Sequence, residues 1–147
     1  MNARAISRIL GAVFLIVGIA GFLPFNWIAP APPFDAPVVT IDTANRLLFG
    51  IFPVNAALDI VYAVLGLWGL LSALSFGAAV WYCRRVAVVF LVLAFFGIIP
   101  LFNTLLGFAP IYGWDVGLHF LTALLAAYGG FGRGSIRSEI AQAASGA

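Results

Sequence analysis

The chain has 147 residues, of which 64% are hydrophobic and only 8% are charged. A soluble domain contains about 45–50% apolar and about 25% charged residues, and a chain this short leaves a large part of its surface in contact with water. The composition therefore excludes a water-soluble enzyme, a nucleic-acid-binding protein and a disordered tail, and it predicts an integral membrane protein.

The charges and the single cysteine limit the kinds of site that the chain can hold. The formal net charge is +2, and all seven basic residues are arginines that lie scattered along the sequence. Such arginines cannot neutralise a run of phosphates, so we expect no nucleic-acid partner. Cys83 alone can form neither an intrachain disulfide nor a cysteine-built metal site. We expect no cofactor and no metal.

Four apolar stretches follow one another along the chain. A helix needs about 20 apolar residues to cross roughly 30 Å of hydrocarbon, and such a helix satisfies its own backbone hydrogen bonds. The sequence therefore predicts an all-α membrane domain over residues 1–131 and a polar cytoplasmic tail over residues 132–147. The predicted transmembrane helices cover about residues 6–23, 56–74, 86–102 and 115–131.

The first stretch has a second interpretation. Its charged start and apolar middle are typical of a signal peptide, with Ala29-Pro30-Ala31 as a possible cleavage site. Pro32 directly after that site disfavours cleavage, and the stretch also matches the third one in sequence. We therefore expect the first stretch to remain in the protein as a transmembrane helix.

The arginines predict the orientation in the membrane. Because cytoplasmic loops carry the excess of arginine and lysine, we expect a multi-pass protein of the cell inner membrane with both termini in the cytoplasm. Arg46 alone falls on the other side. The arginines on the predicted cytoplasmic side are Arg4, Arg8, Arg84, Arg85, Arg133 and Arg137.

The two halves of the chain resemble each other. Residues 8–24 and 84–100 align without gaps, and Gly50–Val54 then aligns with Gly107–Ile111. Each half is a helix pair that enters the membrane in the same sense, which predicts a parallel repeat. The aligned positions on which we place most weight are Arg8 and Arg84, Gly21 and Gly97, and Pro24 and Pro100.

Glycines in the first two stretches suggest how these helices meet. Small residues let the backbones of membrane helices approach closely, although glycine is also common in membrane helices generally. We favour close packing as the explanation. The glycines concerned are Gly11, Gly18, Gly21, Gly66 and Gly69.

The first outer loop, residues 24–53, begins with a proline-rich run that cannot be helical. Asp42 has the character of a helix cap, so we expect a short interfacial helix over Thr43–Phe49. Asp42 and Arg46 are four residues apart and could pair on one face of that helix. The loop could act as a lid or a docking surface, but we favour a simple folded connection.

Few ionisable residues lie near the predicted membrane helices. Asp59 lies in the first turn of the second helix, Asp115 opens the fourth, and His119 lies one turn deeper on the same face. Polar groups inside a membrane are often functional, and Asp115 could hold the imidazole of His119 in one tautomer. The alternative, which we favour, is that both aspartates cap helix N-termini and that His119 makes a structural hydrogen bond between helices.

One histidine per chain cannot supply a bis-histidine haem site or a three-ligand zinc site without a second chain. Serine and threonine occur as scattered single residues, so no catalytic triad can be assembled with any specificity. We therefore name no catalytic, cofactor-binding or metal-binding residue.

The segment Leu47–Leu71, which reads LLFGIFPVNAALDIVYAVLGLWGLL, and the aspartate and histidine four residues apart at Asp115 and His119 carry a family resemblance. With these motifs the chain resembles the bacterial four-helix membrane family catalogued as domain of unknown function 4383, over about residues 8–130. The resemblance implies a four-helix membrane domain and brings no activity with it.

Members of that family often carry two histidines at the start of the second helix. This chain has Leu58 and Tyr62 there, with Asp59 where an asparagine is usual. Tyr62 is aligned with His119 in the internal repeat, so half of any paired-histidine arrangement is replaced. The candidate polar cluster at the outer face is therefore Asp59, Tyr62, Asp115 and His119.

Three functions remain open from the sequence. We favour a non-enzymatic scaffold or accessory subunit that packs in membrane lipid with itself or with other membrane proteins. This choice depends on the shortage of polar groups in the helices. A small transporter or channel subunit with a polar site at the outer face is the first alternative, and an intramembrane redox or lipid enzyme using His119 is the second.

Overall fold

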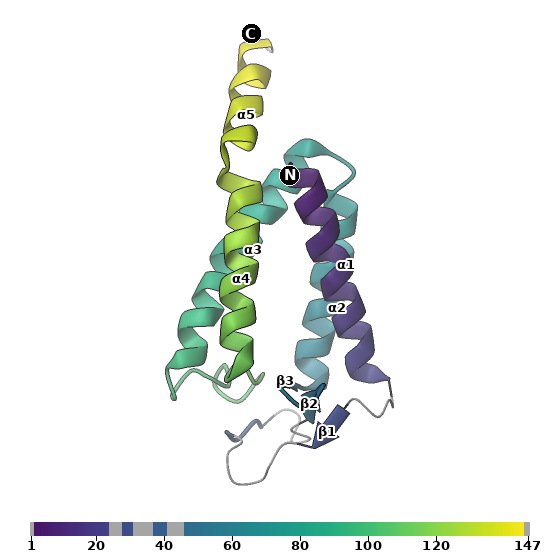
Figure 1. Ribbon diagram of the computed structural model, residues 1–147, viewed down its shortest axis with the longest axis vertical. Helices are drawn as coiled ribbons and strands as arrows, with labels where there is room; N and C mark the ends of the chain where they lie inside the picture. The colour runs from purple at the N-terminus through teal and green to yellow at the C-terminus, as the bar shows by residue number, and fades with distance from the viewer. Residues whose placement is uncertain (1, 24–27, 31–36, 41–45, 146–147) are drawn as a thin grey trace.

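The computed structural model describes residues 2–23, 28–30, 37–40 and 46–145, and these residues form mainly helices, as predicted (Figure 1). Two of the described helices, α1 and α3, are long and apolar enough to cross a membrane, and α2 is an apolar helix of 17 residues. The helices are α1 (Ala3–Phe22), α2 (Ala56–Ser72), α3 (Phe76–Ile98), α4 (Trp114–Phe131) and α5 (Arg133–Ser145).

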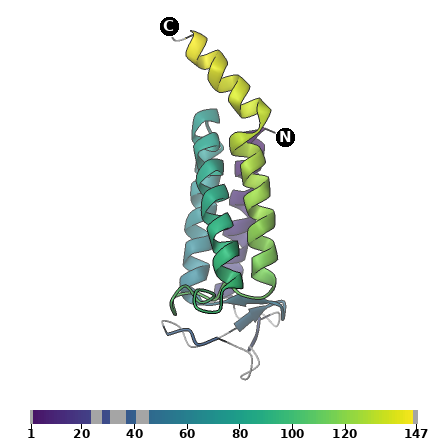
Figure 2. The ribbon, with the colours of Figure 1, turned by 90° about the vertical axis from the view of Figure 1, so that its left-hand side faces the viewer.

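The first four helices form two hairpins that stand side by side. Helix α1 packs along α2, and α3 packs along α4, while α1 also contacts both helices of the second hairpin. Helices α1 and α3 run in the same direction, so both hairpins have the same orientation (Figure 1). The N-terminus and α5 lie at one end of the bundle, and α5 extends beyond it (Figure 2).

Side chains that precede the helices explain where several of them begin. The side chains of Asn2, Asn55 and Ser75 each accept a hydrogen bond from the backbone N–H three residues later, which satisfies a free donor of the first turn. Helix α4 differs, because its capping residue is Gly113, with φ of 67° and no side-chain cap bond.

The third helix begins ten residues before the predicted start, at Phe76 instead of Val86. Arg84 and Arg85 therefore lie inside α3 and not in a loop, so the predicted boundary is wrong. The guanidinium groups find partners along the bundle: Arg84 Nε donates to the carbonyl of Gly130 at 2.9 Å, and Arg85 lies 4.6 Å above the Trp81 ring. These contacts let the arginines remain in a helix whose remaining surface is apolar.

A small antiparallel sheet covers the end of the bundle opposite the termini (Figure 2). It consists of β1 (Ile28–Pro30), β2 (Arg46–Leu48) and β3 (Phe52–Val54), with Arg46 opposite Val54 and Leu48 opposite Phe52. The predicted interfacial helix is therefore wrong over residues 46–49.

Residues 42–45, including Asp42, lie outside the described residues. The cause of the hairpin is a turn at Phe49 and Gly50, where φ is 55° and 74°. Two successive positive φ values define the primed turn that fits the twist of paired strands.

The glycines of the first hairpin confirm the predicted close packing. A Cβ atom added to Gly11 would lie 2.7 Å from the backbone nitrogen of Leu70, and one added to Gly69 would lie 2.8 Å from the Cα of Gly11. Because real Cβ atoms do not come so close to backbone, only glycine permits this approach of α1 to α2.

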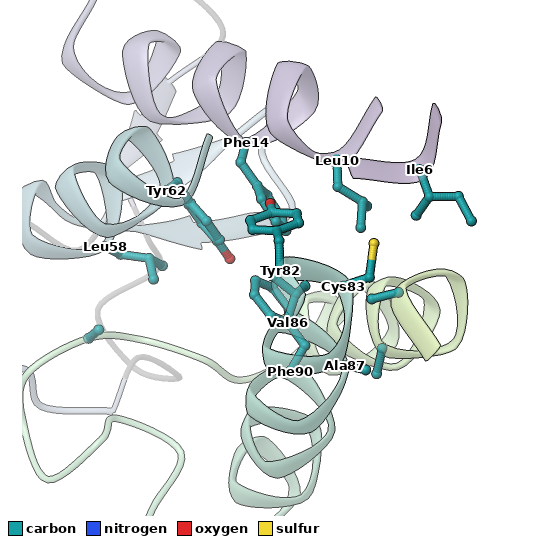
Figure 3. Packing of buried hydrophobic residues seen from close by; sticks show 13 residues of the cluster. Ile6, Leu10, Phe14, Leu58, Tyr62, Tyr82, Cys83, Val86, Ala87 and Phe90 are labelled. Atoms are coloured by element: carbon teal, nitrogen blue, oxygen red, sulfur yellow. The ribbon is translucent and has the colours of Figure 1, made fainter. Parts of the chain in front are cut away.

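The core is centred on aromatic side chains from three helices. Phe14 of α1 stacks on Tyr62 of α2 at 5.7 Å between ring centroids and on Phe90 of α3 at 5.0 Å (Figure 3). From these rings toward the termini, the core continues through the buried residues Ile6, Leu10, Tyr82, Cys83 and Val86.

Candidate functional site

The four polar residues predicted from the sequence all lie at the sheet end of the bundle, and all are buried. The exposed fraction is 0% for Asp59, 8% for Tyr62, 3% for Asp115 and 1% for His119. Asp59 and Tyr62 come from the first two turns of α2, and Asp115 and His119 from the same turns of α4. The structure thus places one pair on each hairpin.

Tyr62 and His119 join the two hairpins. The Tyr62 hydroxyl lies 3.3 Å from His119 Nε2, within hydrogen-bond distance, and the tautomer of the ring decides which atom donates. The His119 ring also packs edge-on against Phe90, with 5.3 Å between centroids. The expected hydrogen bond of His119 between helices is therefore present, and its partner is the residue aligned with it in the predicted repeat.

Asp115 does not orient His119 in the way that the sequence suggested. Asp115 Oδ2 and His119 Nδ1 are buried, and neither atom has a hydrogen-bond partner among the described residues. Nor does the Asp115 side chain cap α4, because the capping position belongs to Gly113 and carries no side-chain bond. The carboxyl group lies in the first turn, where the positive end of the helix dipole favours a negative charge.

Tyr112 lies just before α4 and is affected by the same carboxyl group. Burial raises the pKa of the Tyr112 phenol above its usual value, and the nearby Asp115 charge raises it further. Both effects disfavour a second negative charge beside Asp115. The Tyr112 phenol therefore keeps its proton and adds no negative charge to this end of the bundle.

Asp59 belongs to a different arrangement. Its Oδ2 lies 3.6 Å from Nη2 of Arg46, while Nη1 of Arg46 donates to the carbonyl of Gly21 at 3.1 Å. Asp59 is not the cap of α2, since Asn55 holds that position. The expected capping by Asp59 is therefore wrong. Its carboxylate instead pairs with Arg46 of β2, and Arg46 also binds α1 through the Gly21 carbonyl.

The predicted pair of Asp42 and Arg46 falls partly outside the described residues, because Asp42 is not among them. Within the described part of the chain, the ion pair of Arg46 is with Asp59. Gly21 makes this arrangement possible, because a side chain there would collide with the Asp59 carboxyl group.

Sequence reasoning missed Asn55. This residue is fully buried; its side-chain oxygen accepts from the Leu58 N–H at 2.8 Å, and its nitrogen donates to the carbonyl of Phe108 at 3.0 Å. One side chain thus caps α2 and binds the loop before α4. The available signal was an asparagine directly before an apolar helix, a common capping residue.

A cavity of about 210 Å³ opens at the sheet end between the two hairpins, and we call it the sheet-end pocket. All four bundle helices and the β2–β3 hairpin contribute to its wall, but Asp59 does not. Most of the wall is apolar, as in ligand pockets generally. The polar residues of the lining are Tyr62, Asp115, His119 and Thr122, and the aromatic ones besides Tyr62 are Phe14, Phe49, Phe52 and Phe90.

The pocket has an aromatic floor. Phe14 and Phe90 line it and stack on each other, and the buried apolar core continues from them toward the termini through Leu10, Cys83 and Ile6 (Figure 3). The described residues contain no group of three His, Cys, Asp or Glu side chains that could hold a metal ion. The pocket is thus bounded toward the core by two stacked aromatic rings.

The family model described as Domain of unknown function (DUF4383) matches residues 4–132. This match confirms the resemblance that the sequence motifs indicated over about residues 8–130. Searches of curated proteins and of solved structures find no match to the chain. The description of the family names no activity, so the function has to be inferred from the residues of this chain.

Proposed function

The chain belongs to the family described as Domain of unknown function (DUF4383), and we propose that it is an integral membrane protein in which α1–α4 cross the bilayer. Helix lengths of 17 to 23 residues correspond to about 26–35 Å, close to the hydrocarbon thickness. The observation that carries the proposal is the exposed apolar surface of every helix. Examples are Ile16 at 67%, Val64 at 61%, Val88 at 56% and Leu124 at 67% exposure.

We propose that the end carrying the termini faces the cytoplasm. Arg4 and Arg84 support this orientation, since their side chains donate to the carbonyls of Ala73 and Gly130 near the ends of α2 and α4. Arg46 lies at the opposite end with the sheet. Arginine is enriched on the cytoplasmic side of membrane proteins, so the sheet end would face outward.

We further propose that the two hairpins are a duplicated unit. Gly50 and Gly107, aligned in sequence, have φ of 74° and 90°, and the residues before them, Phe49 and Leu106, also have positive φ. The backbone pairing around the two turns is also alike. Arg46 lies opposite Val54, and the residues aligned with these two, Asn103 and Ile111, are joined by a hydrogen bond from the Ile111 N–H to the Asn103 carbonyl at 2.9 Å. The two turns before α2 and α4 thus share a backbone design.

The role we propose is that of a non-enzymatic accessory protein or scaffold. The aromatic floor at Phe14 and Phe90 supports binding over conduction, because a conducting pathway needs polar groups along its length. His119 is hydrogen-bonded to Tyr62 and packed on Phe90, which supports a binding or structural role over catalysis. The alternative is a small transporter, which is favoured by the position of the polar residues between two similar hairpins.

Cysteine labelling tests the topology. In a Cys83→Ala background, we introduce one cysteine at Val38, which is 80% exposed at the sheet end, or at Gly134, where an added side chain meets nothing within 4 Å. A membrane-impermeant maleimide should label Val38→Cys in intact spheroplasts and Gly134→Cys only after lysis. The opposite pattern, or release of the protein from membranes without detergent, would overturn the proposal.

Light scattering tests the accessory role. The protein purified in mild detergent should have a mass that is a fixed multiple of 15.6 kDa, or it should carry a partner membrane protein in constant ratio. A monomer that retains no partner in any mild detergent contradicts the accessory role and leaves the topology unaffected.

A further inference from the structure

The sheet-end pocket contains polar atoms that the protein itself does not satisfy. Asp115 Oδ2 and His119 Nδ1 are buried without a hydrogen-bond partner among the described residues, and both side chains line the cavity. A buried polar atom without a partner costs about 1–3 kcal/mol, and most buried polar atoms in proteins have one. The two atoms are therefore positions at which a bound molecule could complete the hydrogen bonding.

The charge at this position points to the kind of molecule. Asp115 makes no ion pair within the described part of the chain, whereas the other buried aspartate of this end, Asp59, is paired with Arg46. A carboxylate taken out of water is stabilised strongly by an opposite charge beside it. A cationic ligand would give Asp115 an ion-pair partner, as Arg46 does for Asp59.

The walls of the pocket suit an organic cation. Five aromatic rings line it, those of Phe14, Phe49, Phe52, Tyr62 and Phe90. Aromatic faces attract ammonium groups, and this attraction increases when water is excluded. The same rings bind the apolar body of an amine, which inorganic cations lack.

The volume limits the size of the ligand. An engineered apolar cavity of about 150 Å³ in another protein binds benzene. The 210 Å³ of the sheet-end pocket therefore accommodates a single ring or a short branched chain together with an ammonium group.

We propose that the sheet-end pocket binds a small organic ammonium ion, with the ammonium group against Asp115 Oδ2 and His119 Nδ1 and the apolar body among the aromatic rings. This inference goes beyond the accessory role and does not depend on it. The ammonium group can belong to a free amine or to the ethanolamine headgroup of a lipid, which share the same chemistry.

Calorimetry on the purified protein in a maltoside detergent tests the proposal. The probes are phenethylamine, which is cationic at pH 7, and phenethyl alcohol, its neutral counterpart of similar shape. Phenethylamine should bind at least tenfold more tightly than the alcohol. Asp115→Asn, which keeps the shape of the side chain, should abolish this preference. Asp59→Asn is the matched control, because it removes a buried carboxylate from the same end outside the pocket lining, and it should retain the preference.

If a variant fails to fold, the comparison of amine and alcohol binding by the native protein still decides the outcome. Equal binding of amine and alcohol, or no binding of either, overturns the proposal, and so does a tenfold preference that survives Asp115→Asn. Val17→Phe, which fills the pocket from α1, should weaken the binding of both probes.

A second arm identifies the source of the ammonium group. The amine titration is repeated in nanodiscs of phosphatidylglycerol alone and in nanodiscs that also contain phosphatidylethanolamine. Competition by phosphatidylethanolamine identifies the lipid headgroup as the occupant, and undiminished amine binding identifies a free amine.

Discussion

The two hairpins share a topology but treat their buried carboxyl groups differently. In the first hairpin Asp59 faces α1 and is paired with Arg46. In the second hairpin Asp115 lines the sheet-end pocket and has no such partner in the described part of the chain. Extending the sequence alignment of the two halves aligns Arg46 with Asn103, a neutral residue. The buried carboxylate of the first half thus has an ion-pair partner, whereas that of the second half lines the cavity without one in the described part of the chain.

A shift of one residue accounts for this difference. In the alignment of the halves, Asp115 corresponds to Leu58, and Asp59 corresponds to Val116. Successive residues of an α-helix point about 100° apart, so aspartates that differ by one position face different neighbours. Asp59 therefore faces Gly21 of its own hairpin, and Asp115 faces the space between the hairpins. Changes to the first hairpin should accordingly affect stability most.

The largest effect is expected at Arg46. Arg46→Met leaves the fully buried Asp59 without its ion-pair partner, and breaking a buried pair costs about 3–5 kcal/mol. We expect about 3 kcal/mol, because the Arg46 side chain is 28% exposed. Thermal unfolding in detergent measures the loss, and adding Asp59→Asn should restore part of it. If Arg46→Met alone is as stable as the native protein, the pair of Arg46 and Asp59 does not stabilise the sheet against the bundle.

The glycine interface of the first hairpin should give the next effect. A Cβ at Gly66 would collide with the backbone of Leu15, so Gly66→Ala should destabilise by about 1–3 kcal/mol. Gly117→Ala on α4 is the matched control, since nothing lies within 4 Å of the added atom. That variant should gain about 0.5–1 kcal/mol from helix propensity. If both variants behave alike, the close approach of α1 to α2 at Gly66 does not contribute to stability.

Asn55→Ala should have the smallest effect of the three, about 1–2 kcal/mol, since it removes a helix cap and the bond to the Phe108 carbonyl. Ser75→Ala removes only an exposed cap bond at the start of α3 and should cost less. Comparing the two unfolding midpoints isolates the contribution of the link between the halves. Equal losses would mean that the bond to Phe108 contributes nothing.

Apolar patterning was sufficient to locate the helical core of the bundle but not every helix end. The start of α3 was missed because Arg84 and Arg85 are charged. Arg84 binds the carbonyl of Gly130, 46 residues away in the sequence, and Arg85 lies over the Trp81 ring one turn earlier in the same helix. The hairpin was missed because its turn uses Phe49 before Gly50, where asparagine or aspartate is the usual signal.

The residues of the site were predictable, but their pairing was not. Isolated polar residues near apolar stretches identified Asp59, Tyr62, Asp115 and His119, all of which are buried at one end. Which of them meet depends on how the two hairpins pack. That packing brought His119 to Tyr62, whereas His119 Nδ1 makes no hydrogen bond to the Asp115 carboxyl group one turn away.

The stacked floor of Phe14 and Phe90 has a kinetic consequence. Because the buried core fills the bundle beyond these rings, a molecule held in the pocket would have no passage through the bundle toward the termini, and the β2–β3 hairpin borders the pocket on its other side. If exchange of a ligand requires this hairpin to move, stiffening the turn at Phe49 and Gly50 would slow arrival and escape together while leaving the affinity unchanged.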